Sequence, residues 1–172
     1  RYTLEETLEN VRYLLKDALI RQVDTKSPVC AMLSGGLDSS IMTKYMSDYF
    51  KGRGKRQITT YSVDYVDNEK YFESSKFQPS LDKDFIEIMH NYVQSNHINI
   101  VIENDDLASS LYEATLARDL PGMADIDSSL LLFARQIAKD YKIAVSGECS
   151  DEIFAGYPWY HNKEMLFNEA FP

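Results

Sequence analysis

The feature that most constrains the fold of this chain is an alternation of short apolar runs with segments of helical periodicity. Four apolar runs, each short enough to be a strand, occupy residues 29–33, 58–65, 98–103 and 142–146. Between them lie segments whose apolar residues recur at three- and four-residue spacing, which is the pattern of an amphipathic helix. Strands that alternate with helices predict an α/β fold, in which a parallel sheet carries helices on both faces.

Each predicted helix places its apolar residues on one face. Helices are expected at the N-terminus and over residues 41–50, 82–96, 104–120 and 128–141. The apolar positions are Leu4, Leu8, Val11, Leu15, Ala18 and Leu19 in the first helix, Phe85, Ile88, Met89, Tyr92 and Val93 in the third, and Leu130, Phe133, Ala134, Ile137 and Tyr141 in the last. Thr3 and Glu6 have the spacing of a capping box. Residues 66–80 show no clear period and are predicted to form a loop.

The composition of the chain excludes several classes of protein. Apolar residues make up 44% of the 172 residues, which is enough for a packed core. The net charge of -9 argues against nucleic acid as a partner, because such proteins face phosphates with many Lys and Arg side chains. No apolar run reaches the ~18 residues that a membrane span needs, so no membrane partner is expected.

The cysteines and histidines give no support for a disulfide framework or a zinc site. Cys30 and Cys149 lie far apart in the sequence, and no CxxC pair is present. The three histidines form no motif of metal-ligand spacing. We therefore expect reduced cysteines and a cytoplasmic location.

The turn after the first apolar run has the residues of an anion site. Gly35 and Gly36 allow positive φ and a close approach of the backbone to a ligand. The helix that follows offers unpaired N–H groups and a partial positive charge, which together suit a phosphate. Ser34, Ser39 and Ser40 add hydroxyl groups. The alternative is a tight turn without a ligand, in which Asp38 only caps the helix.

A carboxylate beside a phosphate repels it unless a cation lies between the two groups. Asp38 would repel a phosphate, and Mg²⁺ resolves the conflict because it prefers oxygen ligands from one or two carboxylates and from phosphates. The sequence lacks the GxxxxGK[ST] loop with its lysine, and it also lacks GxGxxG. The turn is therefore predicted to hold a phosphate together with Mg²⁺.

A second Ser-Gly turn follows the fourth apolar run. Ser146 and Gly147 precede three carboxylates within five residues, Glu148, Asp151 and Glu152, at the start of a predicted helix. Carboxylates at that position are often simple partners of the helix dipole. In parallel sheets, however, ligands bind beyond the carboxyl ends of the strands, where both turns lie. The pair of turns therefore favours a shared site for metal and substrate.

Together the two turns resemble the signatures of a known enzyme family. SGGLDSS, residues 34–40, is similar to the pyrophosphate loop of the N-type ATP pyrophosphatases. SGECSDEIFAGY, residues 146–157, resembles the second signature of the glutamine-hydrolysing asparagine synthetases. The resemblance covers essentially the whole chain and is weakest across residues 66–80. It implies the adenine-nucleotide α-hydrolase-like fold of the PP-loop ATP pyrophosphatases. Residues 1–172 would be the N-terminal part of an ATP-binding synthetase domain, with the glutaminase domain and the C-terminal remainder absent.

The resemblance also implies a reaction and its participants. ATP would adenylate the side-chain carboxylate of aspartate with release of pyrophosphate, with Mg²⁺ as cofactor. Ammonia, which the glutaminase domain would release from glutamine, would then give asparagine and AMP.

The resemblance also implies roles for those residues of this sequence that match the motifs of the family. The pyrophosphate would lie against Ser34, Gly35, Gly36, Asp38, Ser39 and Ser40. Leu33, Val63 and Gly147 would flank the adenine, with Ser146 nearby. Asp38 and Asp151 would bind the metal, Glu148 would lie near the reacting centre, and Tyr157 would close the site. Cys149 and Ala155 replace glycines of the usual signature, and Cys149 is expected to be a small packed thiol rather than a reactive one.

Several alternatives remain open at this stage. A related AMP-forming ligase, of the β-lactam or peptide-ring type, would use the same ATP site for another amide. A non-catalytic ATP-binding module is another class, whereas tRNA modification is disfavoured by the acidic charge. A homodimer is neither required nor excluded. Asp119, Asp125 and Asp127 follow the third apolar run by one helix. The resemblance implies that a comparable stretch lies near the amino-acid site, which makes Asp125 and Asp127 candidates, although a helix cap explains Asp127 at least as well.

Overall fold

The computed structural model describes residues 2–54, 57–73 and 81–167, which form a parallel sheet with helices on both faces. The strands are β1 (Val29–Met32), β2 (Thr59–Tyr65), β3 (Asn96–Ile102) and β4 (Ile143–Val145). Their order in the sheet is β3-β2-β1-β4, and every neighbouring pair is parallel. The predicted α/β fold with four parallel strands is confirmed.

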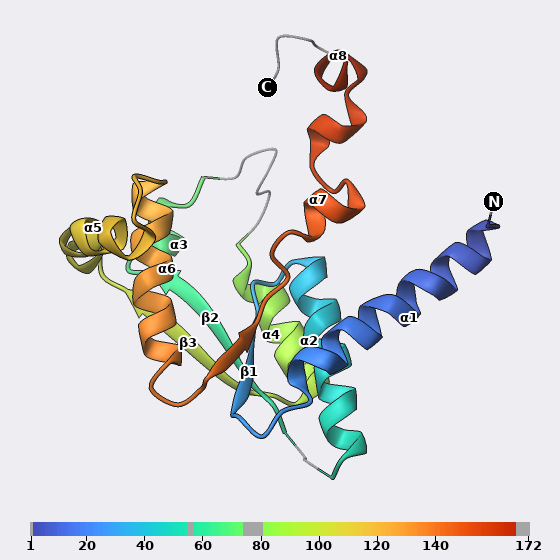
Figure 1. The fold of residues 1–172 in the computed structure, drawn as a ribbon. Helices are drawn as coiled ribbons and strands as arrows, with labels where there is room; N and C mark the ends of the chain where they lie inside the picture. Colours follow the sequence, from blue (N-terminus) through green and yellow to red (C-terminus); the bar gives the residue numbers. More distant parts are fainter. Residues whose placement is uncertain (1, 55–56, 74–80, 168–172) are drawn as a thin grey trace.

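The long helices divide between the two faces of this sheet (Figure 1). One face carries α1 (Leu4–Val23), α2 (Leu37–Gly52) and α4 (Lys83–Val93). The other face carries α5 (Asn104–Arg118) and α6 (Ala124–Ile137). Among the residues that the structure describes, none of the helices has both the length and the apolar character required to cross a membrane.

The remaining elements are short. They are α3 (Asn68–Tyr71), α7 (Ser150–Phe154), the 3-10 helix η1 (Pro158–His161) and α8 (Lys163–Leu166). The predicted loop over residues 66–80 is wrong where α3 forms, and its residues 74–80 lie outside the described part of the chain. α7 to α8 extend beyond the edge of the sheet at which the strands end (Figure 1).

The boundary between α4 and β3 differs from the prediction of a helix through residue 96. α4 ends at Val93, and Gln94 has a left-handed backbone with φ of 57°. Asn96 and His97 instead begin β3, where they pair with Thr59 and Thr60 of β2. The periodicity did not detect the start of this strand because both residues are polar; the His97 ring is satisfied by hydroxyl groups of β2.

The apolar periodicity found the long helices but not all of their ends, since α6 runs over Ala124–Ile137 and not over residues 128–141. It also did not decide which side chains are buried. The predicted capping box at Thr3 and Glu6 is present, yet the first half of α1 projects from the body of the molecule (Figure 1). Leu4 is 77% exposed, whereas Leu19 is fully buried. On α4 only Val93 is buried; Phe85, Ile88 and Tyr92 are all more than half exposed.

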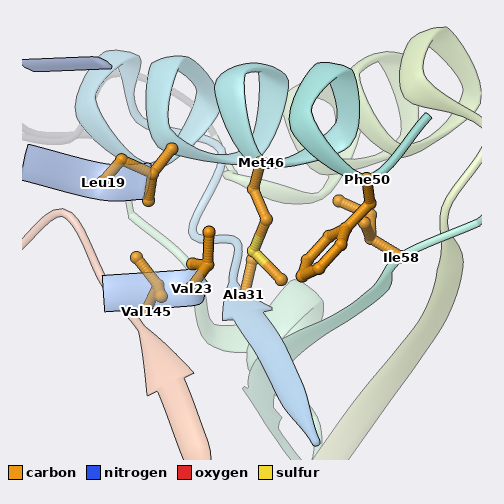
Figure 2. Close-up of a cluster of buried hydrophobic side chains, with 7 residues drawn as sticks. All are labelled: Leu19, Val23, Ala31, Met46, Phe50, Ile58 and Val145. Carbon is orange, nitrogen blue, oxygen red and sulfur yellow. The ribbon is translucent and has the colours of Figure 1, made fainter. Parts of the chain in front are cut away.

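The core on the α1 and α2 side joins four elements, together with Ile58 directly before β2, around one methionine. Figure 2 shows its seven buried side chains, Leu19, Val23, Ala31, Met46, Phe50, Ile58 and Val145. Met46 is fully buried at the centre of α2, and burial of such a side chain contributes about 1.5–3 kcal/mol. This cluster fixes α2 against β1 and so fixes the start of α2 at the edge of the sheet.

A second core fills the space between the sheet and α6. Cys30 and Tyr61 from the sheet pack against Phe133 and Ile137 of α6, as the periodicity of α6 predicted for these two positions. Leu130 of the same predicted face is exposed. Burial raises the pKa of the Cys30 thiol to about 12, so this thiol is a packed, unreactive group.

A polar ladder lies between β2 and β3 on the side of α4. His97 bonds through Nδ1 to the Thr60 hydroxyl at 2.9 Å and through Nε2 to the Ser62 hydroxyl at 3.1 Å. The Ser62 hydroxyl donates to Oδ1 of Asn99 at 2.7 Å. The His97 ring stacks on His90 of α4, and burial, followed by the charge of His90, lowers the pKa of His97.

Candidate functional site

The loop between β1 and α2, residues 33–40, is shaped by close contact with α4. Gly35 has φ of 81°, and a Cβ atom at this position would lie 2.7 Å from the carbonyl oxygen of Asp82 and 3.2 Å from Cβ of Phe85. Only glycine suits both this backbone and this space. The predicted positive φ is thus confirmed at Gly35 but wrong at Gly36, whose φ is -68° at the N-cap of α2.

The hydroxyl of Ser39 is turned into the loop. It accepts a hydrogen bond from the Ser34 N–H at 3.2 Å, lies 3.0 Å from the Ser34 hydroxyl and donates to the Gly36 carbonyl at 3.2 Å. Ser39 is 6% exposed, whereas Ser34 is open to solvent and Ser40 is half-buried. The Ser39 side chain therefore holds the loop in shape, and its direct contact with a phosphate stays a prediction.

The start of α2 has no side-chain cap. Gly36 is the N-cap residue and brings no side chain to the first amide groups of this 16-residue helix. Unpaired N–H groups and the helix dipole at such an end attract an anion. Asp38 is the acidic residue of the first turn, so an anion here would meet both the amides and a carboxylate.

The two Ser-Gly turns are in contact, because β4 pairs directly with β1 and both strands end at the same edge. A Cβ atom on Gly147 would lie 2.8 Å from the backbone nitrogen of Ser39 and 2.9 Å from Cβ of Asp38. Backbone atoms of the loop cannot move aside as the end of a side chain can. Glycine at position 147 therefore allows the second turn to lie directly on the first.

Two carboxylates from the two turns lie close enough to repel each other. Burial, and after it the negative charge of Asp151, raises the pKa of Asp38. Within the described residues, no three side chains of the His, Cys, Asp or Glu type form a metal site by themselves. The pair suits a hard cation that completes its coordination with ligand oxygens, which is how Mg²⁺ commonly binds beside phosphates.

Tyr157 lies among the carboxylates of the second signature. Its pKa is raised, chiefly by the charge of Glu152, then by burial and by Asp151, with a further contribution from Glu148. The Glu148 N–H donates to the Ser146 hydroxyl at 3.3 Å, and the Glu148 side chain is exposed. The sequence counted Glu152 among the acids but gave it no role, although it has the largest effect on Tyr157.

The two departures from the usual signature lie at opposite ends of α7. Cys149, its N-cap residue, has φ of 68°, and Ala155, its C-cap residue, has φ of 55°. Both are left-handed conformations, which explains why glycine is the usual residue at these positions. Cys149 is exposed, so the expectation of a packed thiol is wrong.

The residues predicted to bind the adenine lie on or directly after three neighbouring strands: Val63 within β2, Leu33 after β1, and Ser146 and Gly147 after β4. Leu33 is 1% exposed, and its N–H donates to the Tyr61 carbonyl at 2.8 Å, so little of Leu33 is open to a ligand. Val63 is half-buried and lines a cavity of about 500 Å³ between β2, β3 and α4. Contact of either residue with adenine stays a prediction.

The acidic residues between α5 and α6 serve the junction of these helices. Asp127 is not a helix cap, because α6 begins earlier, after Met123 as its N-cap. The Asp127 carboxylate forms an ion pair with Arg118 of α5, and its side chain is 11% exposed. Asp119 caps the end of α5 with φ of 63°, while the side chain of Asp125 is outside the described part. The predicted cap role of Asp127 is wrong.

Comparison with known proteins identifies what this site is similar to. Residues 10–172 match the asparagine synthase family. Asparagine synthetase [glutamine-hydrolyzing] 3 of Bacillus subtilis (strain 168) is 49% identical over 163 residues, which are 95% of this chain and 26% of that protein. Asparagine synthetase [glutamine-hydrolyzing] of Mesocricetus auratus is 24% identical over 93% of this chain and 27% of its own length. The chain thus spans about a quarter of the length of these relatives.

Proposed function

Because this chain belongs to the asparagine synthase family, we propose that it carries the ATP-binding part of an enzyme that makes asparagine from aspartate. The single observation that supports this most strongly is the contact of Gly147 with Asp38 and Ser39, which joins an anion-binding helix start to a carboxylate-rich turn. Residues 1–172 would be the N-terminal part of the synthetase domain. A glutaminase domain elsewhere in the full-length protein would supply ammonia from glutamine, in keeping with the greater length of the relatives.

The proposed reaction has two steps. An oxygen of the aspartate side chain attacks the α-phosphorus of ATP, and the bond to the leaving pyrophosphate breaks. Ammonia then attacks the acyl carbon, the bond from that carbon to AMP breaks, and the nitrogen loses a proton. The products are asparagine, AMP and pyrophosphate.

The β1–α2 loop is suited to hold the pyrophosphate. The backbone at Gly35 and Gly36 leads into the uncapped start of α2, whose N–H groups would stabilise negative charge as it develops on the leaving group. Ser34 presents an exposed hydroxyl, and Ser39 keeps the loop closed from inside. The loop thus contributes fixed donors that need no rearrangement during the reaction.

Asp38 and Asp151 are the residues that would hold Mg²⁺, which would offset the charge of the pyrophosphate when bound. Their mutual repulsion in this structure is what a cation between them would relieve. Glu148, exposed beside the Ser146-Gly147 turn, would accept the proton that the attacking ammonia loses. Tyr157 would lie over the same carboxylates and limit the access of water. We propose that the activity is cytoplasmic, because ATP is available in the cytoplasm and thiols such as Cys149 stay reduced there.

Aspartate-dependent exchange of labelled pyrophosphate into ATP, measured on the full-length protein, tests this proposal. Exchange that requires aspartate is expected, because adenylation is reversible and precedes the use of ammonia. Exchange with another carboxylic acid would support the related amide-forming ligases instead. A protein that binds MgATP but shows no exchange with any acid in the panel would point to the binding module without catalysis.

A further inference from the structure

An aromatic cluster follows α7 directly, and two of its members, Trp159 and Tyr160, have no part in the functions assigned above. The rings of Tyr157 and Trp159 stack with centroids 4.2 Å apart and an angle of 18° between their planes. Tyr160 lies beside both rings, with centroid distances of 6.3 Å. Trp159 is the single tryptophan of the chain and is 37% exposed. The partly exposed Trp159 ring therefore has its closest aromatic contact with Tyr157, the tyrosine of the candidate site.

Hydrogen bonds hold this aromatic segment against the end of α7. The Gly156 N–H donates to the Asp151 carbonyl at 2.9 Å, and the Tyr160 N–H donates to the Tyr157 carbonyl at 3.1 Å. Nε2 of His161 lies 2.8 Å from the carbonyl oxygen of Ala155. The first two bonds close the end of α7 and the turn of η1, and the third joins these two elements, so the position of Trp159 is tied to the helix that carries Asp151.

The Tyr157 side chain lies near acidic groups, and Trp159 stacks against its ring. The negative charges of Glu152, Asp151 and Glu148 all raise the pKa of the Tyr157 hydroxyl. A tyrosine side chain has two rotatable bonds before its ring, so without a partner the ring can turn away from these carboxylates. The stacked indole restricts that motion, since aromatic pairs at this separation attract each other.

We propose that Trp159 is a positioning residue, whose ring holds Tyr157 at the end of α7, near Asp151 and Glu152, during the reaction. This inference rests on the proposed function of the same site. Trp159 touches no reacting atom in this account and acts only through Tyr157. Loss of the Trp159 ring should therefore lower kcat. The affinity for ATP, which depends on the β1–α2 loop, should be preserved.

Steady-state kinetics of asparagine formation by the full-length protein test the proposal. Trp159→Leu removes the ring but keeps apolar volume, and it is expected to lower kcat about two- to twelvefold, the range that corresponds to the loss of one aromatic pair. The KM for ATP is expected to stay within about twofold of the wild-type value. Trp159→Phe keeps a ring and should restore most of the rate. Tyr112→Leu, an exposed tyrosine on α5, is the matched control and should leave kcat unchanged.

A double-mutant cycle separates positioning from a general structural effect. In the Tyr157→Ala background, Trp159→Leu should have no further effect on kcat, because its partner is already gone. The proposal would be overturned if Trp159→Leu changed kcat by the same factor with and without Tyr157. It would also be overturned if the single variant Trp159→Leu kept the wild-type kcat. A wild-type protein without aspartate-dependent exchange would instead refute the proposed function itself, so the two failures are distinguishable.

Discussion

Replacement of Gly147 by alanine is the sharpest perturbation that the structure offers, because it acts on the contact between the two turns. The added Cβ atom would lie 2.8 Å from the Ser39 nitrogen, 2.9 Å from Cβ of Asp38 and 3.1 Å from its carbonyl carbon. Two of these three are backbone atoms in a loop closed by its own hydrogen bonds. The second turn must therefore shift by several tenths of an ångström away from the first.

The expected cost follows from this overpacking. Forcing an extra carbon into a tightly packed contact destabilises proteins by about 1–3 kcal/mol, and we expect the free energy of unfolding to fall by that amount. If ATP binding requires the two turns to be in contact, the affinity for ATP should fall as well. A loss of about 1–3 kcal/mol in binding free energy would weaken ATP binding by roughly 5- to 150-fold.

Urea unfolding and calorimetric titration with MgATP, both on the full-length protein, measure the two effects of Gly147→Ala. The matched control is Gly52→Ala at the end of α2, where a Cβ atom would meet nothing within 4 Å. Alanine there should be neutral or stabilise the helix by up to about 1 kcal/mol, and ATP binding should not change. If Gly147→Ala behaved like Gly52→Ala in both measurements, the packing argument for the joined turns would be refuted.

Three further predictions follow from the fold. Cys149→Gly and Ala155→Gly should each raise the free energy of unfolding by about 0.5–1 kcal/mol in urea, because both residues have left-handed backbones; equal or lower stability would contradict that. Met46→Ala should lower the free energy of unfolding by about 2–5 kcal/mol, because Met46 is fully buried between α2 and the sheet; a loss below ~1 kcal/mol in the same assay would show a loosely packed core. Stability should fall as the pH drops through 6.5, the ordinary pKa of histidine, toward the lower pKa of folded His97, because the unfolded chain then binds the proton more readily. His97→Gln should remove this part of the pH dependence of unfolding, and an unchanged profile would argue against it.

The sequence predicted those parts of the site that depend on local chemistry. A glycine between a strand and a helix suggests a backbone with positive φ, and Gly35 has this conformation. The juxtaposition of the two turns followed from the rule that parallel strands end at one edge. The direction of the Ser39 hydroxyl could not be inferred, because it depends on hydrogen bonds that exist only once the loop has closed.

Burial was harder to predict than secondary structure. The periodicity of α4 identifies an apolar face, but whether anything covers that face depends on the rest of the molecule, and Ile88 is 66% exposed. The start of β3 was missed because Asn96 and His97 are polar, and their partners lie more than thirty residues earlier in the sequence. Cys149 was expected to be packed on the general behaviour of cysteine, whereas the left-handed turn before α7 leaves it exposed.

The central claim is that the two turns form one site for ATP and Mg²⁺. Its most direct test is calorimetric titration of ATP into the full-length protein, with and without Mg²⁺, for the wild type and for Asp38→Asn. We expect wild-type binding to require Mg²⁺, and we expect the variant, with its melting temperature preserved, to bind MgATP at least about tenfold more weakly. Binding of equal strength in all four titrations would show that the two turns do not form such a site.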